Sequence, residues 1–208
     1  MSATLDGTRT FLSATLSAME KKGWHSRGYL PHYDCDKFQF VTFRLADSLP
    51  QSVLKKFEQE LKHKKLDHFY DRGFQIKIEE YLDRGIGACE LGQAAIAEIL
   101  IRSLLMFNGE RYILAAWVVM PNHGHILLKP LPGFSLTSIM KGLKGNTANQ
   151  ANKFLGRKGR FWHPDYFDRY IRDETHFRKT VRYIENNPVK AGLVETPDQW
   201  EYSSAYIG

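Results

Sequence analysis

The chain has 208 residues, of which 43% are hydrophobic and 13% aromatic, which is enough for one domain with a buried core and excludes a disordered composition. Its longest apolar run, residues 113–120, is far shorter than the roughly 20 residues that cross a bilayer, and its first residues do not have the pattern of a signal peptide. Cys35 and Cys89 are isolated, which excludes a disulfide framework or a cysteine-rich metal site. We therefore expect a cytoplasmic protein with no membrane partner.

The formal net charge of +6 is concentrated in one segment. Residues 141–182 contain eleven Lys or Arg and four Asp or Glu, a local balance of +7. Aromatic residues are interleaved with these charges, and this combination is typical of proteins that bind single-stranded nucleic acid. A solvated basic surface over core aromatics is the alternative, and composition alone does not decide between the two.

In chain order, the first predicted element is a strand over residues 38–45, FQFVTFRL, because β-branched and aromatic residues alternate there with polar ones. Residues 49–70 carry apolar side chains at helical spacing among many charges, which predicts an amphipathic helix. Residues 91–107 repeat that pattern and end at Asn108-Gly109, a pair that terminates helices.

Two strands are predicted next, residues 111–120 and 123–129, joined by a turn at Pro121-Asn122. The first is apolar on both faces, as expected of a central strand. Residues 135–154 form a third predicted helix with Ser135 as its N-cap, although Gly142 and Gly145 weaken it.

Residues 156–159, rich in Gly and Lys, are the expected mobile linker. A fourth helix then begins after Asp173 and runs to about Asn186, where Pro188 is expected to end it. Helices mixed with a hairpin favour an α+β sandwich around an antiparallel sheet. We expect one domain over residues 1–208, with the sheet and most helices in 23–155 and a linker, helix and tail in 156–208.

His123 and His125 flank Gly124 at the start of the second strand of the hairpin. Residues two apart in a strand point to the same face, with Cα atoms about 6.6 Å apart, so both imidazoles can reach one metal ion. Gly124 leaves the opposite face bare, where another backbone or a helix could pack closely. An ordinary pair of polar residues at a strand start is the alternative.

Tyr183 and Asn187 lie four residues apart in the fourth helix, hence on one face. A tyrosine hydroxyl can act as the nucleophile on a phosphodiester if a metal, held by two histidines and an amide oxygen, polarises the phosphate. The alternative is that Tyr183 is a buried amphipathic residue and that Asn186 and Asn187 cap the helix.

Three segments, WVVMPNHGHILL, GRFWHPDYFDRYIRD and YIENNPVKAGLV, together resemble the REP-associated tyrosine transposases, a branch of the single-tyrosine transposases named for a His-hydrophobic-His motif. RGYLPHYD and the following VTFRLADSLP resemble the longer members of that branch. The resemblance covers about residues 24–194 and has the motifs in the order found in the family.

The resemblance implies a ferredoxin-like sandwich of the HUH type, with the histidine pair on a central strand and the tyrosine on a C-terminal helix. It implies that Mg²⁺ or Mn²⁺ is bound by His123, His125 and Asn187, and that Tyr183 cuts single-stranded DNA beside a hairpin and stays joined to the 5′-phosphate. Expected DNA contacts from the basic segment are Lys141, Lys144, Arg157, Lys158, Arg160, Trp162, Arg169 and Arg172. The protein would act as a monomer or a homodimer.

Two positions depart from the family pattern. Gly124 stands where the family has a bulky apolar residue, which removes a core anchor and is expected to loosen the strand. His163 stands where relatives often carry glutamine, which bears on local DNA contacts. Neither departure removes an expected ligand or the expected nucleophile.

Three functions are compatible with the sequence. The leading one is a metal-dependent DNA endonuclease and strand transferase that acts through Tyr183. The second is a DNA-hairpin-binding protein of the same fold with weak catalysis. The third is a two-histidine metal hydrolase that uses activated water, and the absence of an Asp or Glu near the His pair in the sequence disfavours it. The residues offer no obvious general base for Tyr183.

Overall fold

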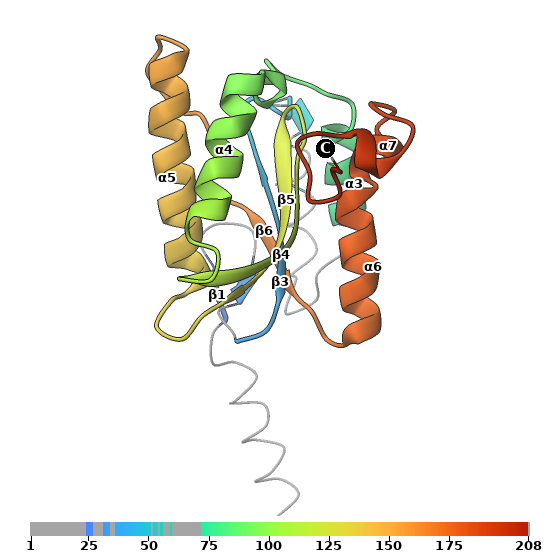
Figure 1. Ribbon diagram of the computed structural model, residues 1–208. Coiled ribbons are helices and arrows are strands. Elements are labelled where there is room, and N and C mark those ends of the chain that lie inside the picture. Colours follow the sequence, from blue (N-terminus) through green and yellow to red (C-terminus); the bar gives the residue numbers. More distant parts are fainter. Residues whose placement is uncertain are drawn as a thin grey trace, which may run out of the picture.

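The structure, a computed structural model, describes residues 24–26, 31–33, 36–50, 52–53, 55, 59 and 72–207. Its centre is a four-stranded antiparallel sheet in the order β4-β5-β3-β6 (Figure 1). The strands are β3 (Gln39–Arg44), β4 (Tyr112–Val119), β5 (His123–Pro130) and β6 (Phe167–Tyr170). Two short strands, β1 (Trp24–Ser26) and β2 (Pro31–Tyr33), pair in a separate antiparallel ribbon.

Helices cover both faces of this sheet (Figure 1). The helices α4 (Ala94–Met106) and α5 (Leu136–Phe154) lie side by side on one face, and α6 (Glu174–Glu185) lies on the other. The helices α3 (Arg72–Leu82) and α7 (Asn187–Lys190) lie at one end of α6, and single 3₁₀ turns occur at Glu90–Gly92 and Pro197–Gln199. The predicted α+β sandwich, with a central antiparallel sheet flanked by helices and a C-terminal helix bearing the tyrosine, is confirmed.

The sheet has a buried layer on each face because successive side chains of a strand point in opposite directions. On β5, Ile126 and Leu128 belong to the core under α4 and α5, whereas Leu127 belongs to the smaller core under α6. The two histidines share the orientation of Leu127, so the strand alternation places them on the α6 face.

The predicted β4–β5 hairpin is present, with Pro121-Asn122 at its turn. The pairing shifts register between Leu114 and Ala116, so Ala115 forms a bulge in β4. The strand predicted over residues 38–45 is confirmed as β3, and the helices predicted over 91–107 and 135–154 are confirmed as α4 and α5.

Both predicted helix caps are also confirmed. Ser135 and Ser138 form a reciprocal capping box at the start of α5, and the side chain of Asp173 accepts a hydrogen bond of 2.7 Å from the backbone N–H of His176 at the start of α6. The helix predicted over residues 49–70 lies mostly outside the described residues.

The predicted end of the fourth helix is confirmed, because α6 ends at Glu185 with Asn186 as its C-cap. Pro188 follows in the first turn of the short helix α7, where its missing N–H costs no helical hydrogen bond. Residues 156–159, the expected linker, are contacted at two points: Arg157 pairs with Glu90, and Asn152 donates a 2.9 Å hydrogen bond to the carbonyl of Gly159. The mobility of this segment stays a prediction. Several described elements were not predicted from the sequence: β1, β2, β6, α3, α7 and the two 3₁₀ turns.

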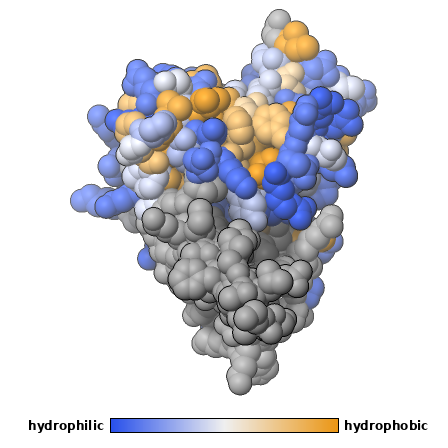
Figure 2. Space-filling view, turned by 90° about the horizontal axis from the view of Figure 1, so that it is seen from below, coloured by the Kyte–Doolittle hydropathy of each residue, from blue (hydrophilic) through white to orange (hydrophobic). Residues whose placement is uncertain are grey.

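The surface is mixed in character. Seen from below, hydrophobic residues gather between hydrophilic flanks (Figure 2). Ile113, Phe134 and Phe154 are among the large apolar side chains that remain exposed. In the part of the chain that the structure describes, no helix is long and apolar enough to cross a membrane.

Candidate functional site

His123 and His125 lie on the α6 face of β5, both fully buried, with ring centroids 4.8 Å apart and planes at 80°. The predicted same-face arrangement is therefore confirmed. The residue between them points the other way, and a side chain at Gly124 would meet the ring of Phe43 at 2.9 Å. Phe43 is the cross-strand partner of Gly124 in β3.

The Phe43 ring changes the expectation for Gly124. The position lacks its own side chain, but an aromatic ring from the neighbouring strand fills that space and packs against Trp162 at 5.1 Å between centroids. The predicted close approach is made by a side chain, not by a backbone or helix. The core anchor is supplied by β3, so the expected loosening of the strand is not supported.

Asn122 fixes the orientation of His123. Its amide nitrogen donates to the carbonyls of Leu82 and Ile86, at 3.1 and 3.0 Å, and its Oδ1 lies 2.7 Å from Nδ1 of His123. With both amide hydrogens used, the oxygen that faces the imidazole can only accept. The hydrogen of neutral His123 is therefore on Nδ1, and its Nε2 carries a free lone pair.

His125 is held by β3. Its Nδ1 lies 2.8 Å from the hydroxyl oxygen of Thr42, its cross-strand partner, and its ring stacks on Phe40 at 5.4 Å between centroids. A hydroxyl can donate or accept, so this contact orients the ring without assigning its tautomer. Such partners are the usual means by which metal-ligating imidazoles are oriented.

Tyr183 comes from α6 and lies over the histidine strand. Its ring packs edge-to-face on His125, at 5.5 Å between centroids, and on Phe40, at 5.7 Å. Asn187, at the start of α7, is 1% exposed. The structure thus brings Tyr183, Asn187 and the two histidines of one chain into one buried cluster, which we call the HHYN cluster.

The polar atoms of the HHYN cluster have no good partners within the described residues. Nε2 of His123 and of His125, the Tyr183 hydroxyl and both side-chain amide atoms of Asn187 are buried without a well-formed hydrogen bond. Buried polar groups are normally satisfied, and a concentration of unsatisfied ones indicates a ligand, an ion or water at that point.

Burial dominates the electrostatics of the cluster. It lowers the pKa of His123 to about 3, with a smaller contribution from the positive charge of Lys190, and it lowers the pKa of His125 well below its ordinary value. Both imidazoles are therefore neutral near pH 7, the form that binds metals. Burial also raises the pKa of Tyr183 strongly, assisted by the charge of the nearby Glu79 carboxylate and opposed by Asn187.

These donors fit a small divalent cation. Within the described residues no group of three or more His, Cys, Asp or Glu converges in a way that could hold a metal, so a third protein ligand here would be the amide of Asn187. Two imidazole nitrogens and one amide oxygen suit Mn²⁺, Co²⁺ or Zn²⁺, and phosphate oxygens and water in the remaining positions would favour Mg²⁺ or Mn²⁺.

The expected DNA contacts are spread over both sides of the sheet. Lys141 and Lys144 lie on α5, on the face opposite Tyr183, and the segment with Arg157, Lys158 and Arg160 follows the end of that helix (Figure 1). Arg169 and Arg172 lie close to His176 at the start of α6. The structure does not gather these groups around the HHYN cluster, and their role as DNA contacts stays a prediction.

Trp162 has a different environment from the other expected contacts. It is 5% exposed, belongs to the core under α4 and α5, and donates its indole N–H to the Thr147 hydroxyl at 2.9 Å. In this position the ring has no exposed face for stacking on a base, which favours a structural role. The neighbouring His163 is partly buried, and its ring contacts the backbone of Asp165.

Sequence reasoning missed four residues of the site: Asn122, Thr42, Phe43 and Glu79. Asn122 looked like a turn residue, although its place directly before the histidine pair was a signal. Thr42 and Phe43 become recognisable only through the β3–β5 register. Glu79, a buried carboxylate in α3, comes from a helix that the sequence did not predict.

Comparison with known proteins agrees with the resemblance inferred from the sequence motifs. Residues 101–187, which contain the whole HHYN cluster, match the family model described as "Transposase IS200 like". The REP-associated tyrosine transposase of Escherichia coli (strain K12) is 33% identical over 90 residues, 43% of this chain and 52% of that protein. This chain therefore spans about half the length of the curated relative that it matches.

A solved structure is also similar in fold. The structure described as a REP-associated tyrosine transposase bound to a REP hairpin superposes with a TM-score of 0.50 at 20% sequence identity, covering 86% of this chain and 81% of that one. The resemblance to REP-associated tyrosine transposases, predicted from the motifs, is confirmed by these comparisons.

Proposed function

We propose that this chain, whose residues 101–187 match the IS200-like transposase model, is a divalent-metal-dependent endonuclease and strand transferase for single-stranded DNA beside hairpins. The observation that carries the proposal is the HHYN cluster. A tyrosine hydroxyl, the Nε2 atoms of two imidazoles and an amide oxygen meet in one buried place, and none has a well-formed hydrogen bond within the described residues. A structural tyrosine and an ordinary pair of strand histidines would be expected to be satisfied.

His123, His125 and Asn187 would hold the metal, which when bound polarises a phosphate and offsets its negative charge. The protein prepares these ligands in advance. Asn122 keeps Nδ1 of His123 protonated so that Nε2 faces the cluster, and Thr42 orients His125. Desolvation keeps both rings neutral, so no proton has to leave them before a cation binds.

Tyr183 would attack the scissile phosphorus. The bond from the tyrosine oxygen to phosphorus forms, the bond from phosphorus to the 3′-oxygen breaks, and that oxygen takes up a proton while the hydroxyl of Tyr183 loses one. The product is a 5′-phosphotyrosine and a free 3′-hydroxyl, which can attack in reverse to rejoin a strand. The contact of the Tyr183 ring with His125 and Phe40 holds the hydroxyl beside the ligands before DNA arrives.

The experiment is an incubation of the protein with hairpin oligonucleotides that carry single-stranded flanks, in Mn²⁺, Mg²⁺ or EDTA. We expect a covalent protein–DNA species on a denaturing gel with either metal, in step with strand cleavage, and neither in EDTA. Cleavage without a covalent species would instead indicate a water nucleophile and the hydrolase function. Binding without cleavage on every hairpin would indicate the DNA-binding function.

The histidine pair provides a second arm of the same experiment. His123→Ala and His125→Ala should abolish metal-dependent cleavage and leave hairpin binding largely intact, because neither side chain is exposed to contact DNA directly. Unchanged cleavage by the double variant would exclude the metal site.

A further inference from the structure

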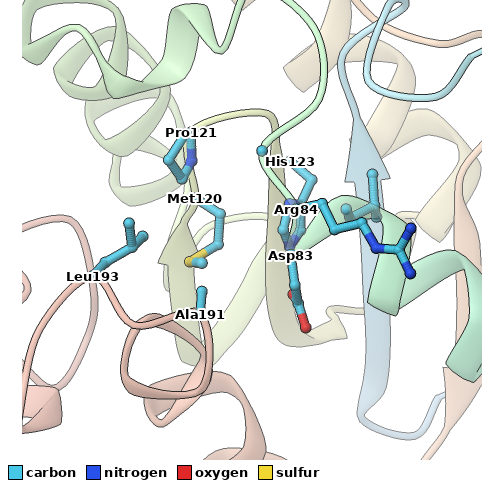
Figure 3. Close-up of a pocket in the computed structure, with 9 residues that line it drawn as sticks. Asp83, Arg84, Met120, Pro121, His123, Ala191 and Leu193 are labelled. Atoms are coloured by element: carbon cyan, nitrogen blue, oxygen red, sulfur yellow. The ribbon is translucent and has the colours of Figure 1, made fainter.

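A pocket of about 230 Å³ opens beside His123 (Figure 3). Three segments form it: the end of α3 with Leu82 and Asp83, the β4–β5 turn with Met120 and Pro121, and the chain after α7 with Leu193. In Figure 3, Met120 and Pro121 line one side, and Asp83, Arg84 and His123 line the other. Most of the wall is apolar, and the polar groups are confined to one side.

The pocket shares a wall with the HHYN cluster. His123 lines the pocket and belongs to the cluster, and the adjacent Lys190 lies close enough to lower the pKa of His123. A phosphate held at the cluster would therefore have its flanking sugar and base within reach of the pocket.

Asp83 lines the pocket and has one carboxylate oxygen that no described residue uses as a hydrogen-bond acceptor. Its Oδ2 accepts a hydrogen bond of 2.7 Å from the Lys190 ammonium. Its Oδ1 is buried and has no hydrogen-bond partner within the described residues. A buried carboxylate oxygen without a donor is costly, so an N–H group in the pocket that reaches Oδ1 after a small rotation of the Asp83 side chain would gain a charge-assisted hydrogen bond.

These features select among possible occupants. An aliphatic chain would leave Oδ1 of Asp83 unsatisfied, and a metal cation would compete with the ammonium of Lys190 that already neutralises the carboxylate. Pockets for drug-sized ligands measure about 300–1,000 Å³, so the present volume suits a single flat ring system. A nucleobase has apolar faces and N–H groups on its edge, and enzymes bind unstacked bases between apolar side chains in this way.

We propose that this pocket receives the nucleobase that flanks the scissile phosphate, with Oδ1 of Asp83 accepting a hydrogen bond from an N–H group on its Watson–Crick edge. The proposal deepens the proposed function and rests on it, because it assumes that a phosphodiester occupies the HHYN cluster. It makes Asp83 a specificity-determining residue and leaves the chemistry to Tyr183.

The test uses hairpin binding measured by fluorescence anisotropy with Mn²⁺, in Tyr183→Phe so that the substrate is not cut, with each base of the single-stranded flanks replaced in turn by an abasic residue. All variants described below carry Tyr183→Phe as well. We expect one flank position at which the abasic residue weakens binding about tenfold. At that position, unsubstituted purine or 2-pyrimidinone, which keep the ring but lack the N–H donor, should weaken binding by a similar factor, as expected for loss of a charge-assisted hydrogen bond.

Variants assign this effect to the pocket. Asp83→Ala should bind the natural base and its donor-free analogue equally well, whereas Lys190→Gln, which removes the ion pair but keeps the acceptor, should still discriminate between them. Leu193→Trp fills the pocket from its exposed rim and should remove the abasic effect. Leu105→Trp, at a similarly exposed position on α4, is the control for the added indole and should retain the effect.

Two outcomes overturn the proposal: equal affinity for all abasic substrates, or unchanged discrimination between the natural base and its analogue in Asp83→Ala. The covalent species at Tyr183, measured separately with Mn²⁺, reports on the proposed function. If that species forms while no flank base matters for affinity, the pocket proposal fails and the proposed function stands. If discrimination depends on Asp83 but no covalent species forms, the proposed function fails and the pocket binds a base without catalysis.

Discussion

The ring of Phe43 lies over Gly124, its cross-strand partner, and fills the space that a side chain between the two histidines would occupy. An added Cβ would stand 2.9 Å from Cζ of Phe43, closer than packed carbon atoms approach. An aromatic ring over a strand glycine is a known way to restore packing in a sheet. The histidine strand is thus supported from behind by a residue that the motif itself does not contain.

This relationship predicts the effect of filling the gap. Gly124→Val should lower the free energy of unfolding by about 1–3 kcal/mol, because the new side chain overpacks the core. Combined with Phe43→Ala, it should cost clearly less than the sum of the two single changes, because the valine then fills a cavity. Urea denaturation of the four proteins measures this coupling.

The control is Gly142→Ala on α5, where nothing lies within 4 Å of an added Cβ. That change should stabilise the helix by about 0.5–1 kcal/mol, because alanine has the higher helix propensity. Additive costs for Gly124→Val and Phe43→Ala would show that the ring does not occupy the space over the glycine.

Asn122 is predicted to affect metal affinity at the proposed site without itself contacting the metal. Asn122→Leu removes the acceptor at Nδ1 of His123 and the donor bonds to the carbonyls of Leu82 and Ile86, and should weaken Mn²⁺ binding about 10–100-fold. Asn122→Asp keeps the acceptor and loses the donors, so it should retain more of the metal affinity. Calorimetry measures the affinities, and imidazole ¹⁵N shifts measure the tautomer of His123.

In the wild-type protein, the imidazole ¹⁵N shifts should show that the hydrogen of neutral His123 is on Nδ1. A hydrogen on Nε2, or equal metal affinity in all three proteins with the fold intact, would contradict the role assigned to Asn122.

Much of the architecture follows from local sequence, and the exceptions have physical causes. The β4–β5 hairpin was predictable from two apolar runs around Pro121-Asn122, and α6 from its Asp173 cap. The strand β6, Phe167–Tyr170, has only four residues, two of them charged, and is a strand because it pairs with β3. Its pairing partner is more than a hundred residues away, which no local pattern reports.

The residues of the candidate site also fall into a group that could be predicted from the sequence and a group that could not. The HHYN residues were predictable because their residue types and their spacing indicate a metal site and a nucleophile. Their supports depend on contacts between distant segments: Asn122 bonds to the chain 40 residues earlier, and Thr42 to His125 across 83 residues. Trp162 was predicted to contact DNA because it is an aromatic residue in the basic segment. Its burial in the core results from tertiary packing, which residue type does not indicate.

The basic segment predicts a salt-dependent affinity. Lys141, Lys158 and Arg160 are exposed, and changing all three to Gln should weaken hairpin binding and reduce the slope of log Kd against log salt by up to about one for each phosphate that is no longer neutralised. The control changes Arg102 and Arg111, exposed residues outside residues 141–182, and should have a smaller effect per charge. Equal effects per charge would indicate that the segment is only a solvated face.

His163 predicts a pH dependence of stability. Burial, with the charge of Arg44, lowers its pKa to about 4 from an ordinary value of 6.5. Between these values the unfolded chain binds the proton and the folded one does not, so stability falls as pH drops from 6.5 to 4. His163→Gln should lose stability less steeply over that window, with a difference on the order of 1 kcal/mol after allowance for solvent screening.

The comparison of variant with wild type cancels the contributions of the two buried cluster histidines, which both proteins retain. Parallel stability curves from pH 7 to 4 would show that His163 does not titrate differently on folding.

The most direct test of the account is the covalent protein–DNA species in Tyr183→Phe, with Tyr170→Phe on β6 as the matched control. The Tyr183 ring packs on His125 and Phe40 and its hydroxyl makes no well-formed hydrogen bond within the described residues, so losing one oxygen should preserve fold and DNA binding. Intact-protein mass spectrometry after incubation with hairpin DNA and Mn²⁺ should show the added strand on wild type and Tyr170→Phe, and none on Tyr183→Phe, which should also not cleave. Cleavage by Tyr183→Phe at the wild-type rate would contradict the account and assign the attack to water or another residue.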